Sequence, residues 1–396
     1  MRYVNNTYFI ITFILGNILC CSCTKEMNNP VVTLPGITIS GTNLFEGTQK
    51  NASFSVKVYL NKTSEKPVSF DYTTEGLAAS AVTDFLAKTG KIVIPPGSLN
   101  SEILIEVVAD SIKELDEDFK LVFSNPQNGI LNQNEVTCTI RNDDKYVPSS
   151  NDGYLSADSY PGYKLVWSDE FNENTLNAGD WNYDIGGSGW GNNESQYYTG
   201  DTKNSYVKNG KLTIEAIKEK YQGKDYTSAR LTTKGKKEFK FGRIDVRAKL
   251  PKGQGIWPAI WMLGANIDAV KWPLCGEIDI MELLGNNPSK VYATIHHSPQ
   301  GLQAQGIYNL PTGKTFSDEF HVFSLDWDAD KMSILLDDKV FFSTTAAKLN
   351  ASPYPFNSPF FFILNIAVGG RWPGYPDATT VFPQKMEIDY VRVFQK

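Results

Sequence analysis

The chain has 396 residues, 41% hydrophobic and 21% charged, so it is long enough for two domains that each bury a core. Its formal net charge is −6 and it has no polybasic stripe, which argues against nucleic acid or an anionic lipid surface as a partner. Aromatic residues make up 12% of the chain, a content that suits a neutral partner with flat apolar faces.

The N-terminus carries an apolar run, FIITFILGNILCC, at residues 9–21. This run is too short to span a bilayer and has the length of a signal-peptide core. Ser22 and Cys23 follow it, and a small residue before a cysteine resembles a bacterial lipoprotein cleavage box. We therefore expect a lipoprotein signal peptide over residues 1–22, lipidation of Cys23 (Cys21 is second choice), and export to the cell envelope or cell surface. A plain secretory signal is the alternative.

The remaining sequence reads as all-β. Short alternating runs such as ASFSVKVYL and KLTIEAI are separated by Gly, Asn, Asp and Pro turns, and no long stretch repeats apolar residues at helical spacing. The polar segments 23–35 and 145–162 lack periodicity and read as a spacer and a linker. They leave one β-sandwich over residues 36–144 and a larger one over residues 163–396.

The two internal cysteines, Cys138 and Cys275, fall in different domains, so we expect no disulfide. No group of Cys and His has the sequence spacing of a zinc site.

The smaller domain contains an ordered series of short motifs: Glu46-Gly47, FDYTT at 70–74, TDF at 83–85, IPPG at 94–97, the acidic run around 114–118, and IRNDD at 140–144. This order resembles a Calx-beta domain. In that family, carboxylates near one end of the sandwich can bind Ca²⁺, but the same residues can merely cap turns and keep sheet edges soluble. We expect a spacer or docking role for this domain.

The chemistry centres on the segment CGEIDIMELL at residues 275–284. On a strand, Glu277 and Asp279 share one face, while strict alternation would send Glu282 to the apolar face at serious cost. A β-bulge at Met281 would return Glu282 to the face of the other two carboxylates.

Crowded carboxylates cannot all ionise easily, so one of them keeps its proton near neutral pH. A retaining glycosidase uses this split, with one carboxylate as the nucleophile and one acid that protonates the departing oxygen. The segment therefore indicates glycoside hydrolysis.

The wider sequence supports this interpretation. Over nearly all of residues 163–396 it resembles glycoside hydrolase family 16 in its bulged, laminarinase-like form, through the ordered motifs LVWSDEF at 165–171, GNNESQYYT at 191–199, SAR at 228–230, FGRIDVR at 241–247, GIWPAIWML at 255–263, LNIAVGG at 364–370 and DYVRV at 389–393. The resemblance implies a concanavalin-like β-jelly roll with the sugar across its concave face. It also implies Glu277 as nucleophile, Glu282 as acid/base and Asp279 as their assistant.

The resemblance further implies a set of cleft residues that hold the sugar: Asn192, Glu194, Arg230, Trp257, Trp261, His296, Asn365 and Trp372. Tryptophan rings offer flat faces for pyranose stacking, although Trp257 and Trp261 would also suit a core. Arg230 would equally suit a structural ion pair. A lone histidine is more often structural than catalytic, but strand parity places His296 beside the carboxylates.

A structural Ca²⁺ on the convex side is also implied, held by Glu170, the carbonyl of Gly210 and Asp389. The alternative is that these acids cap turns. No cofactor is expected for the chemistry itself.

Together these features predict a monomeric, retaining endo-β-1,3-glucanase that acts on laminarin-type glucan, and they leave mixed β-1,3/1,4-glucan open as a further substrate. The nearest alternative is a hydrolase of a marine galactan such as agar, porphyran or carrageenan, since those relatives share the bulged strand. A non-catalytic β-glucan-binding surface protein and an adhesion protein are the alternatives from other classes.

Overall fold

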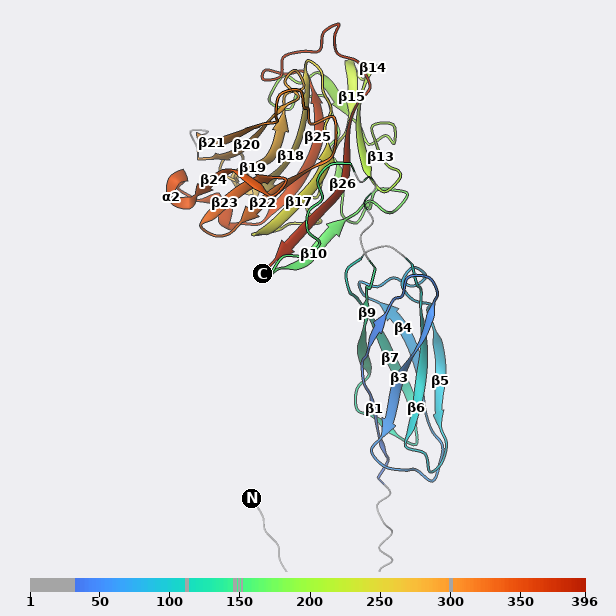
Figure 1. Ribbon diagram of the computed structural model, residues 1–396. Helices are drawn as coiled ribbons and strands as arrows, with labels where there is room; N and C mark the ends of the chain where they lie inside the picture. Colours follow the sequence, from blue (N-terminus) through green and yellow to red (C-terminus); the bar gives the residue numbers. More distant parts are fainter. Residues whose placement is uncertain (1–32, 111–113, 145–147, 149, 151, 299–301) are drawn as a thin grey trace, which may run out of the picture.

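The computed structural model describes residues 33–110, 114–144, 148, 150, 152–298 and 302–396. The predicted signal peptide and Cys23 lie outside these residues. The described chain forms two β-rich units, coloured blue to cyan and green to red in Figure 1, which confirms the predicted all-β class. Among the described residues, no helix has the length and apolar character needed to cross a membrane.

The smaller unit is a sandwich of two antiparallel-rich sheets. Its strands are β1 (Gly36–Ile39), β2 (Asn43–Phe45), β3 (Ala52–Leu60), β4 (Val68–Gly76), β5 (Thr89–Ile94), β6 (Asn100–Val107), β7 (Glu117–Gln127), β8 (Ile130–Leu131) and β9 (Glu135–Arg141). One sheet has the order β6-β3-β1-β8 and the other β2-β9-β7-β4-β5. Every second residue of β3 from Val56 onward is buried, as alternation requires of a strand with one face on a core.

Acidic side chains gather within this sandwich unit. Ligand oxygens of Glu46, Asp110 and Asp144 lie within 4.8 Å of one another. Burial raises the pKa of Glu46 to about 7 and that of the nearby Glu114 to about 8. Calcium binding and turn capping thus stay the two alternatives for these carboxylates.

The larger unit contains most of the strands. They are β10 (Lys164–Asp169), β11 (Asn182–Tyr183), β12 (Gln196–Tyr198), β13 (Ser205–Val207), β14 (Leu212–Tyr221), β15 (Lys224–Ser228), β16 (Arg230–Thr232), β17 (Gly242–Lys249), β18 (Ile256–Gly264), β19 (Glu277–Leu283), β20 (Lys290–His297), β21 (Leu302–Asn309), β22 (His321–Trp327), β23 (Lys331–Leu336), β24 (Lys339–Thr345), β25 (Phe360–Val368) and β26 (Gln384–Gln395). Three one-turn helices interrupt them: α1 (Ile267–Val270), α2 (Ala346–Leu349) and the 3₁₀ helix η1 (Pro355–Asn357).

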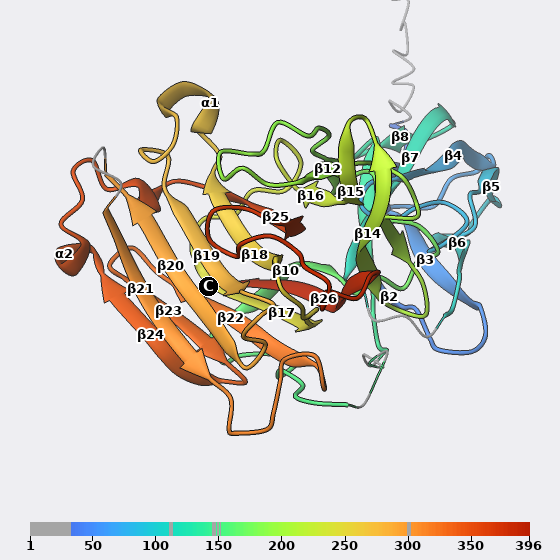
Figure 2. The ribbon, with the colours of Figure 1, turned by 90° about the horizontal axis from the view of Figure 1, so that it is seen from above.

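Two sheets pack face to face in this unit, as predicted for a jelly roll. The seven-stranded sheet has the order β11-β16-β25-β18-β19-β20-β21, and Figure 2 shows β18 to β21 side by side. The ten-stranded sheet has the order β12-β15-β14-β26-β17-β22-β23-β24, with β10 paired to β26 and β13 to β14. On β18, Ile256, Ile260 and Met262 face the core between the sheets, so Trp257 and Trp261 face the other side.

The segment predicted as a linker, 145–162, differs from that expectation over its second part. Tyr154 and Ser156 contact the ten-stranded sheet: the Tyr154 carbonyl accepts from Arg247 Nε at 2.7 Å, and the Ser156 amide donates to Tyr390 at 3.0 Å. Arg247 is fully buried and needs such acceptors, a demand that sequence periodicity does not reveal.

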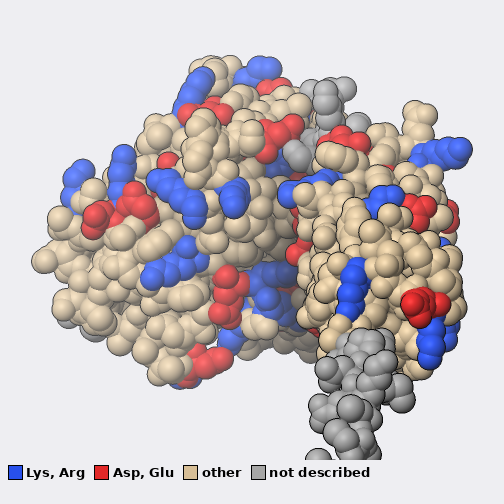
Figure 3. Space-filling view, turned by 90° about the horizontal axis from the view of Figure 1, so that it is seen from below, with Lys and Arg blue, Asp and Glu red and all other residues tan. Residues whose placement is uncertain are grey.

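Charged side chains of both signs are interspersed with uncharged ones over the face shown in Figure 3. The cleft that concerns function lies instead on the outer face of the seven-stranded sheet. Most of its lining residues come from β16, β18, β19, β20, β21 and β25, and residues of α1 and of the surrounding loops complete the lining.

Candidate active site

The central strand of the site, β19, contains a β-bulge. Asp279 pairs with Trp261 and Met281 pairs with Ile260, so Ile280 is an extra residue relative to β18. Ile280 and Met281 are consecutive, yet both are fully buried in the core. The bulge predicted at this position is therefore confirmed, and Glu277, Asp279 and Glu282 all line one cleft.

The start of β19 depends on two glycines. Gly276 has φ of 80°, and a Cβ there would lie 2.9 Å from the Phe360 ring and 3.0 Å from Pro355. A Cβ on Gly264 would lie 2.0 Å from the carbonyl oxygen of Cys275. Only glycine fits both positions, so a side chain at either one would displace the backbone that leads into β19.

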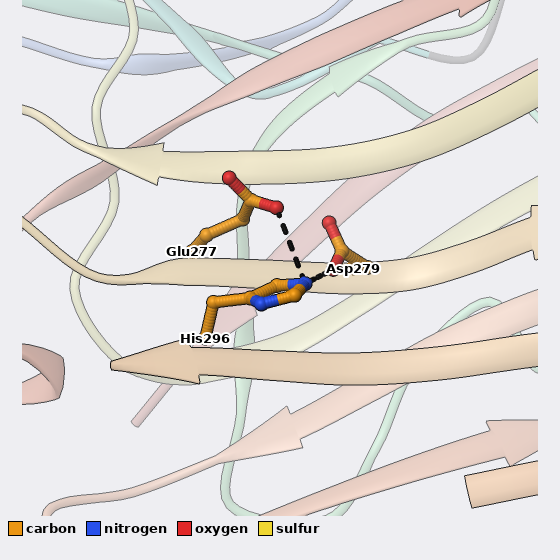
Figure 4. A group of neighbouring side chains, drawn as sticks. All are labelled: Glu277, Asp279 and His296. Atoms are coloured by element: carbon orange, nitrogen blue, oxygen red, sulfur yellow. Dashed lines mark ion pairs between the residues drawn. The ribbon is translucent and has the colours of Figure 1, made fainter. Parts of the chain in front are cut away.

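Glu277 and Glu282, the first and last of the three carboxylates along β19, each accept a hydrogen bond from a tryptophan. Trp272 Nε1 donates to Glu277 Oε2 at 2.9 Å, and Trp257 Nε1 donates to Glu282 Oε1 at 3.1 Å. His296, on the neighbouring strand β20, places Nε2 at 3.5 Å from Glu277 Oε1 and 3.2 Å from Asp279 Oδ2 (Figure 4). The three carboxylates thus have different surroundings although they share one strand.

These surroundings separate the pKa values. Burial, followed by the charges of Asp279 and Glu277, raises the pKa of Glu282 well above its ordinary value. Burial and the charge of Glu277 do the same to the pKa of Asp279. Burial also raises the pKa of Glu277, but His296, Trp272, Arg230 and a hydrogen bond with Asp279 all favour its ionised form. Glu277 is therefore the carboxylate with the most support for a negative charge.

The cleft above these carboxylates has a volume of about 740 Å³. Every residue predicted to be catalytic or sugar-binding lines it: Asn192, Glu194, Arg230, Trp257, Trp261, Glu277, Asp279, Glu282, His296, Asn365 and Trp372. Trp372 meets Trp257 edge to face at 5.4 Å and Tyr292 at 5.0 Å, which gives the cleft an aromatic wall beside Glu282. The structure brings the predicted set together; their individual roles stay predictions.

Arg230 combines the two roles weighed from the sequence. Its Nε donates to Asp184 at 2.9 Å, so it does form an ion pair. Its guanidinium also lies 4.7 Å from the ring centres of both Trp190 and Trp261. One face of Trp261 is therefore covered by a cation, which leaves less of that ring for a sugar than a free tryptophan would offer.

A buried polar network supports this side of the cleft. Trp261 Nε1 donates to Asn365 Oδ1 at 2.7 Å, and Asn365 Nδ2 donates to the Tyr198 hydroxyl at 3.1 Å. Gln196 donates to Glu194 Oε2 at 2.6 Å. Glu194 and Asn365 are only 6% and 5% exposed, and both hydrogen-bond other residues of this side of the cleft.

Several lining residues were not predicted. They are Trp190, Trp272, Tyr292, Thr294, Gln303 and Gln305. Strand parity with His296 could have identified Tyr292 and Thr294, since all three alternate along β20. The glutamines lie on β21, which carries no catalytic motif and so gave no signal.

The two acidic residues predicted to bind calcium each have an arginine partner. Glu170 accepts two hydrogen bonds from Arg392, at 2.8 and 2.9 Å, and Asp389 accepts one from Arg247 at 2.6 Å. Gly210 adopts a positive φ of 67° in the turn before β14. Calcium at this site stays a prediction that these contacts do not support.

Comparison with known proteins identifies families that match the two units of the chain. Residues 192–392 match glycosyl hydrolases family 16, and residues 42–144 match the Calx-beta domain, so both predicted resemblances are confirmed. Residues 114–269 also match the beta-glucan synthesis-associated protein SKN1/KRE6/Sbg1 family.

Individual relatives cover the larger unit. A beta-glucanase of Rhodothermus marinus is 42% identical over 256 residues, 60% of this chain and 87% of the relative. A glucan endo-1,3-beta-glucosidase of Cryptopygus antarcticus is 39% identical over 232 residues, 54% of this chain and 84% of the relative. Among solved structures, the laminarinase catalytic domain of Thermotoga maritima is 48% identical with a TM-score of 0.56, covering 59% of this chain and 98% of that domain.

Proposed function

The chain belongs to glycosyl hydrolases family 16, and we propose that it is a retaining endo-glycosidase that hydrolyses β-1,3-glucan of the laminarin type. One observation carries the proposal: the bulged strand β19 lines Glu277, Asp279 and Glu282 along one cleft. Family membership makes the chain a glycoside hydrolase, and the glucanase relatives support glucan as the substrate.

The proposed reaction proceeds in two displacements at the anomeric carbon. First, a Glu277 oxygen attacks that carbon while the Glu282 carboxyl gives its proton to the departing glycosidic oxygen. A covalent glycosyl ester on Glu277 forms, and the downstream sugar leaves as an alcohol. Then the Glu282 carboxylate takes a proton from water, the water oxygen attacks the same carbon, and Glu277 leaves as a carboxylate. Two inversions retain the β configuration.

The surroundings of the carboxylates suit these roles. Glu282 is only 8% exposed and its pKa is raised by burial and by its acidic neighbours, which favours the protonated acid. The groups that stabilise charge on Glu277 favour a nucleophile. Burial and the charge of Glu277 raise the pKa of Asp279, which lies between them, and this favours a protonated Asp279 that donates a hydrogen bond to Glu277.

The lining of the cleft favours a neutral glucan over a sulfated galactan. Among the described lining residues, Arg230 is the one Lys or Arg side chain, and it is already paired with Asp184. A sulfated sugar would need free cationic partners in the cleft. Aromatic rings and uncharged amides, by contrast, suit the flat faces and hydroxyls of glucose.

Purified protein with laminarin, mixed-linkage glucan, agarose and carrageenan tests the proposal by the appearance of new reducing ends. We expect release from laminarin with β-configured first products, loss of release in Glu277→Gln, and unchanged release in Glu173→Gln at an exposed position. Release from a galactan alone would keep the mechanism and overturn the substrate. Binding of glucan without hydrolysis would favour a non-catalytic receptor.

The predicted features outside the cleft enter the proposal as well. We propose a monomer, exported and anchored through a lipid on Cys23, which palmitate labelling of the parent and of Cys23→Ser tests. A structural Ca²⁺ at Glu170, Gly210 and Asp389 is tested by dialysis against EGTA, which would lower the midpoint of thermal unfolding if that ion is bound.

A further inference from the structure

The cleft floor contains a mixed set of metal-ligand types that the glycosidase mechanism does not explain by itself. Glu277 and Asp279 from β19 point toward His296 from β20, as Figure 4 shows. His296 Nε2 lies 3.5 Å from Glu277 Oε1 and 3.2 Å from Asp279 Oδ2. All three atoms lie within 4.8 Å of one another.

These spacings fit a small tetrahedral cation. Zinc binds imidazole nitrogen and carboxylate oxygen at about 2.0–2.2 Å, and ligands at tetrahedral angles are then about 3.3 Å apart. The two distances from His296 Nε2 lie on either side of that value. Because the cluster lines an open cleft, a water or a sugar hydroxyl can take the fourth position.

A second observation points to a ligand at this place. Asp279 Oδ2 is buried and has no hydrogen-bond partner in the part of the chain that the structure describes. The Asp279 side chain is 4% exposed, and its oxygen is aimed at His296. Glu277 accepts from Trp272 through Oε2, and its other oxygen, Oε1, lies on the side of the histidine. An unsatisfied buried carboxylate oxygen is costly, and a cation would satisfy it.

We propose that Glu277, Asp279 and His296 form a site for a divalent cation of the zinc class, and that an ion bound there competes with substrate. One imidazole with two carboxylates suits zinc, copper or nickel, whereas calcium and magnesium prefer oxygen ligands alone. A bound ion would occupy Glu277 and the space above it. The cation site would exist whether or not glucan is the substrate.

Strand parity placed His296 beside the carboxylates but did not indicate a cation site, because the ligands come from two paired strands. Glu277 and His296 are direct neighbours across β19 and β20, and Asp279 lies two residues along. No Cys and His spacing along the chain encodes such a set.

Zinc titration of the full-length protein tests the proposal. The protein is stripped with EDTA, and ZnCl₂ binding is measured by calorimetry and equilibrium dialysis for the parent, His296→Gln and His297→Gln. The control histidine is adjacent in sequence but does not line the cleft. Comparison between these variants cancels any zinc held by the N-terminal cysteines, which all three share.

We expect His296→Gln to bind one zinc fewer than the parent and His297→Gln, or to bind it at least about tenfold more weakly. Zinc should also raise the apparent KM for laminarin in the parent and leave kcat unchanged. Thermal unfolding and Ca²⁺ binding of each variant check that the fold and other cation sites are intact. Equal zinc binding by the parent and a folded His296→Gln would overturn the site, and loss of kcat without a change in KM would overturn the competition.

Discussion

The two tryptophans that donate to the catalytic glutamates should control opposite sides of the pH profile. Trp257 Nε1 donates to Glu282 Oε1 at 3.1 Å, and this bond lowers the pKa of Glu282. Trp257→Phe keeps an aromatic ring and removes the donor, so the pKa of Glu282 should rise further. Because the acid must be protonated, activity falls as pH rises through that pKa. The basic side of the profile should therefore move to higher pH.

The size of the shift follows from the hydrogen bond. A hydrogen bond to a charged group contributes about 1.5–3 kcal/mol, and one pKa unit corresponds to about 1.36 kcal/mol. Water in the cleft recovers part of the loss, so we take the lower end and expect a shift of about one unit. Trp272→Phe removes the donor to Glu277, which must be ionised, so the acidic side should move to higher pH. Trp272 is 52% exposed, and its shift should be below about one unit.

The assay is kcat/KM on laminarin as a function of pH for the parent and each variant. Trp261→Phe is the matched control, since its indole nitrogen donates to Asn365 and not to a carboxylate. It should raise KM and leave both sides of the profile in place. If the basic side of the pH profile does not move in Trp257→Phe, or moves equally in Trp261→Phe, then Glu282 is not the acid whose pKa this hydrogen bond lowers.

Three further substitutions test the architecture around the cleft. Arg247→Met leaves the fully buried Asp389 without this partner and should lower the free energy of unfolding in urea by about 3–5 kcal/mol, while Lys220→Met at an exposed ion pair should change it little. Trp372→Ala removes an aromatic face of about 60 Å², worth about 1.5 kcal/mol, so KM for laminarin should rise about tenfold with kcat nearly constant. Gly276→Ala places a side chain on a residue with positive φ, with its Cβ 2.9 Å from an atom of the Phe360 ring. This change should lower the free energy of unfolding by about 2 kcal/mol and reduce kcat. Unchanged activity would contradict the role given to this glycine.

Much of the site could be predicted because strands impose a simple rule on side chains. Alternation placed Glu277 and Asp279 together, and the cost of burying Glu282 among apolar residues required a bulge. The structure contains that bulge, with Ile280 and Met281 both turned into the core. The aromatic motif on β18 likewise fixed which tryptophans face the cleft.

The sequence by itself therefore determined the all-β class, the two sandwich units and the carboxylate strand, because periodicity and motif order are local properties. Tertiary structure alone decided which groups meet. It sandwiched Arg230 between two indoles, gave Glu170 and Asp389 arginine partners, and packed the segment from Asp152 onto a sheet. It also set the register that pairs His296 with Glu277, where strand parity had indicated only that His296 lies on the side of the carboxylates. Each of these contacts joins residues far apart in the chain, and their pairing depends on sheet register and on the need of buried charges for partners, neither of which local pattern encodes.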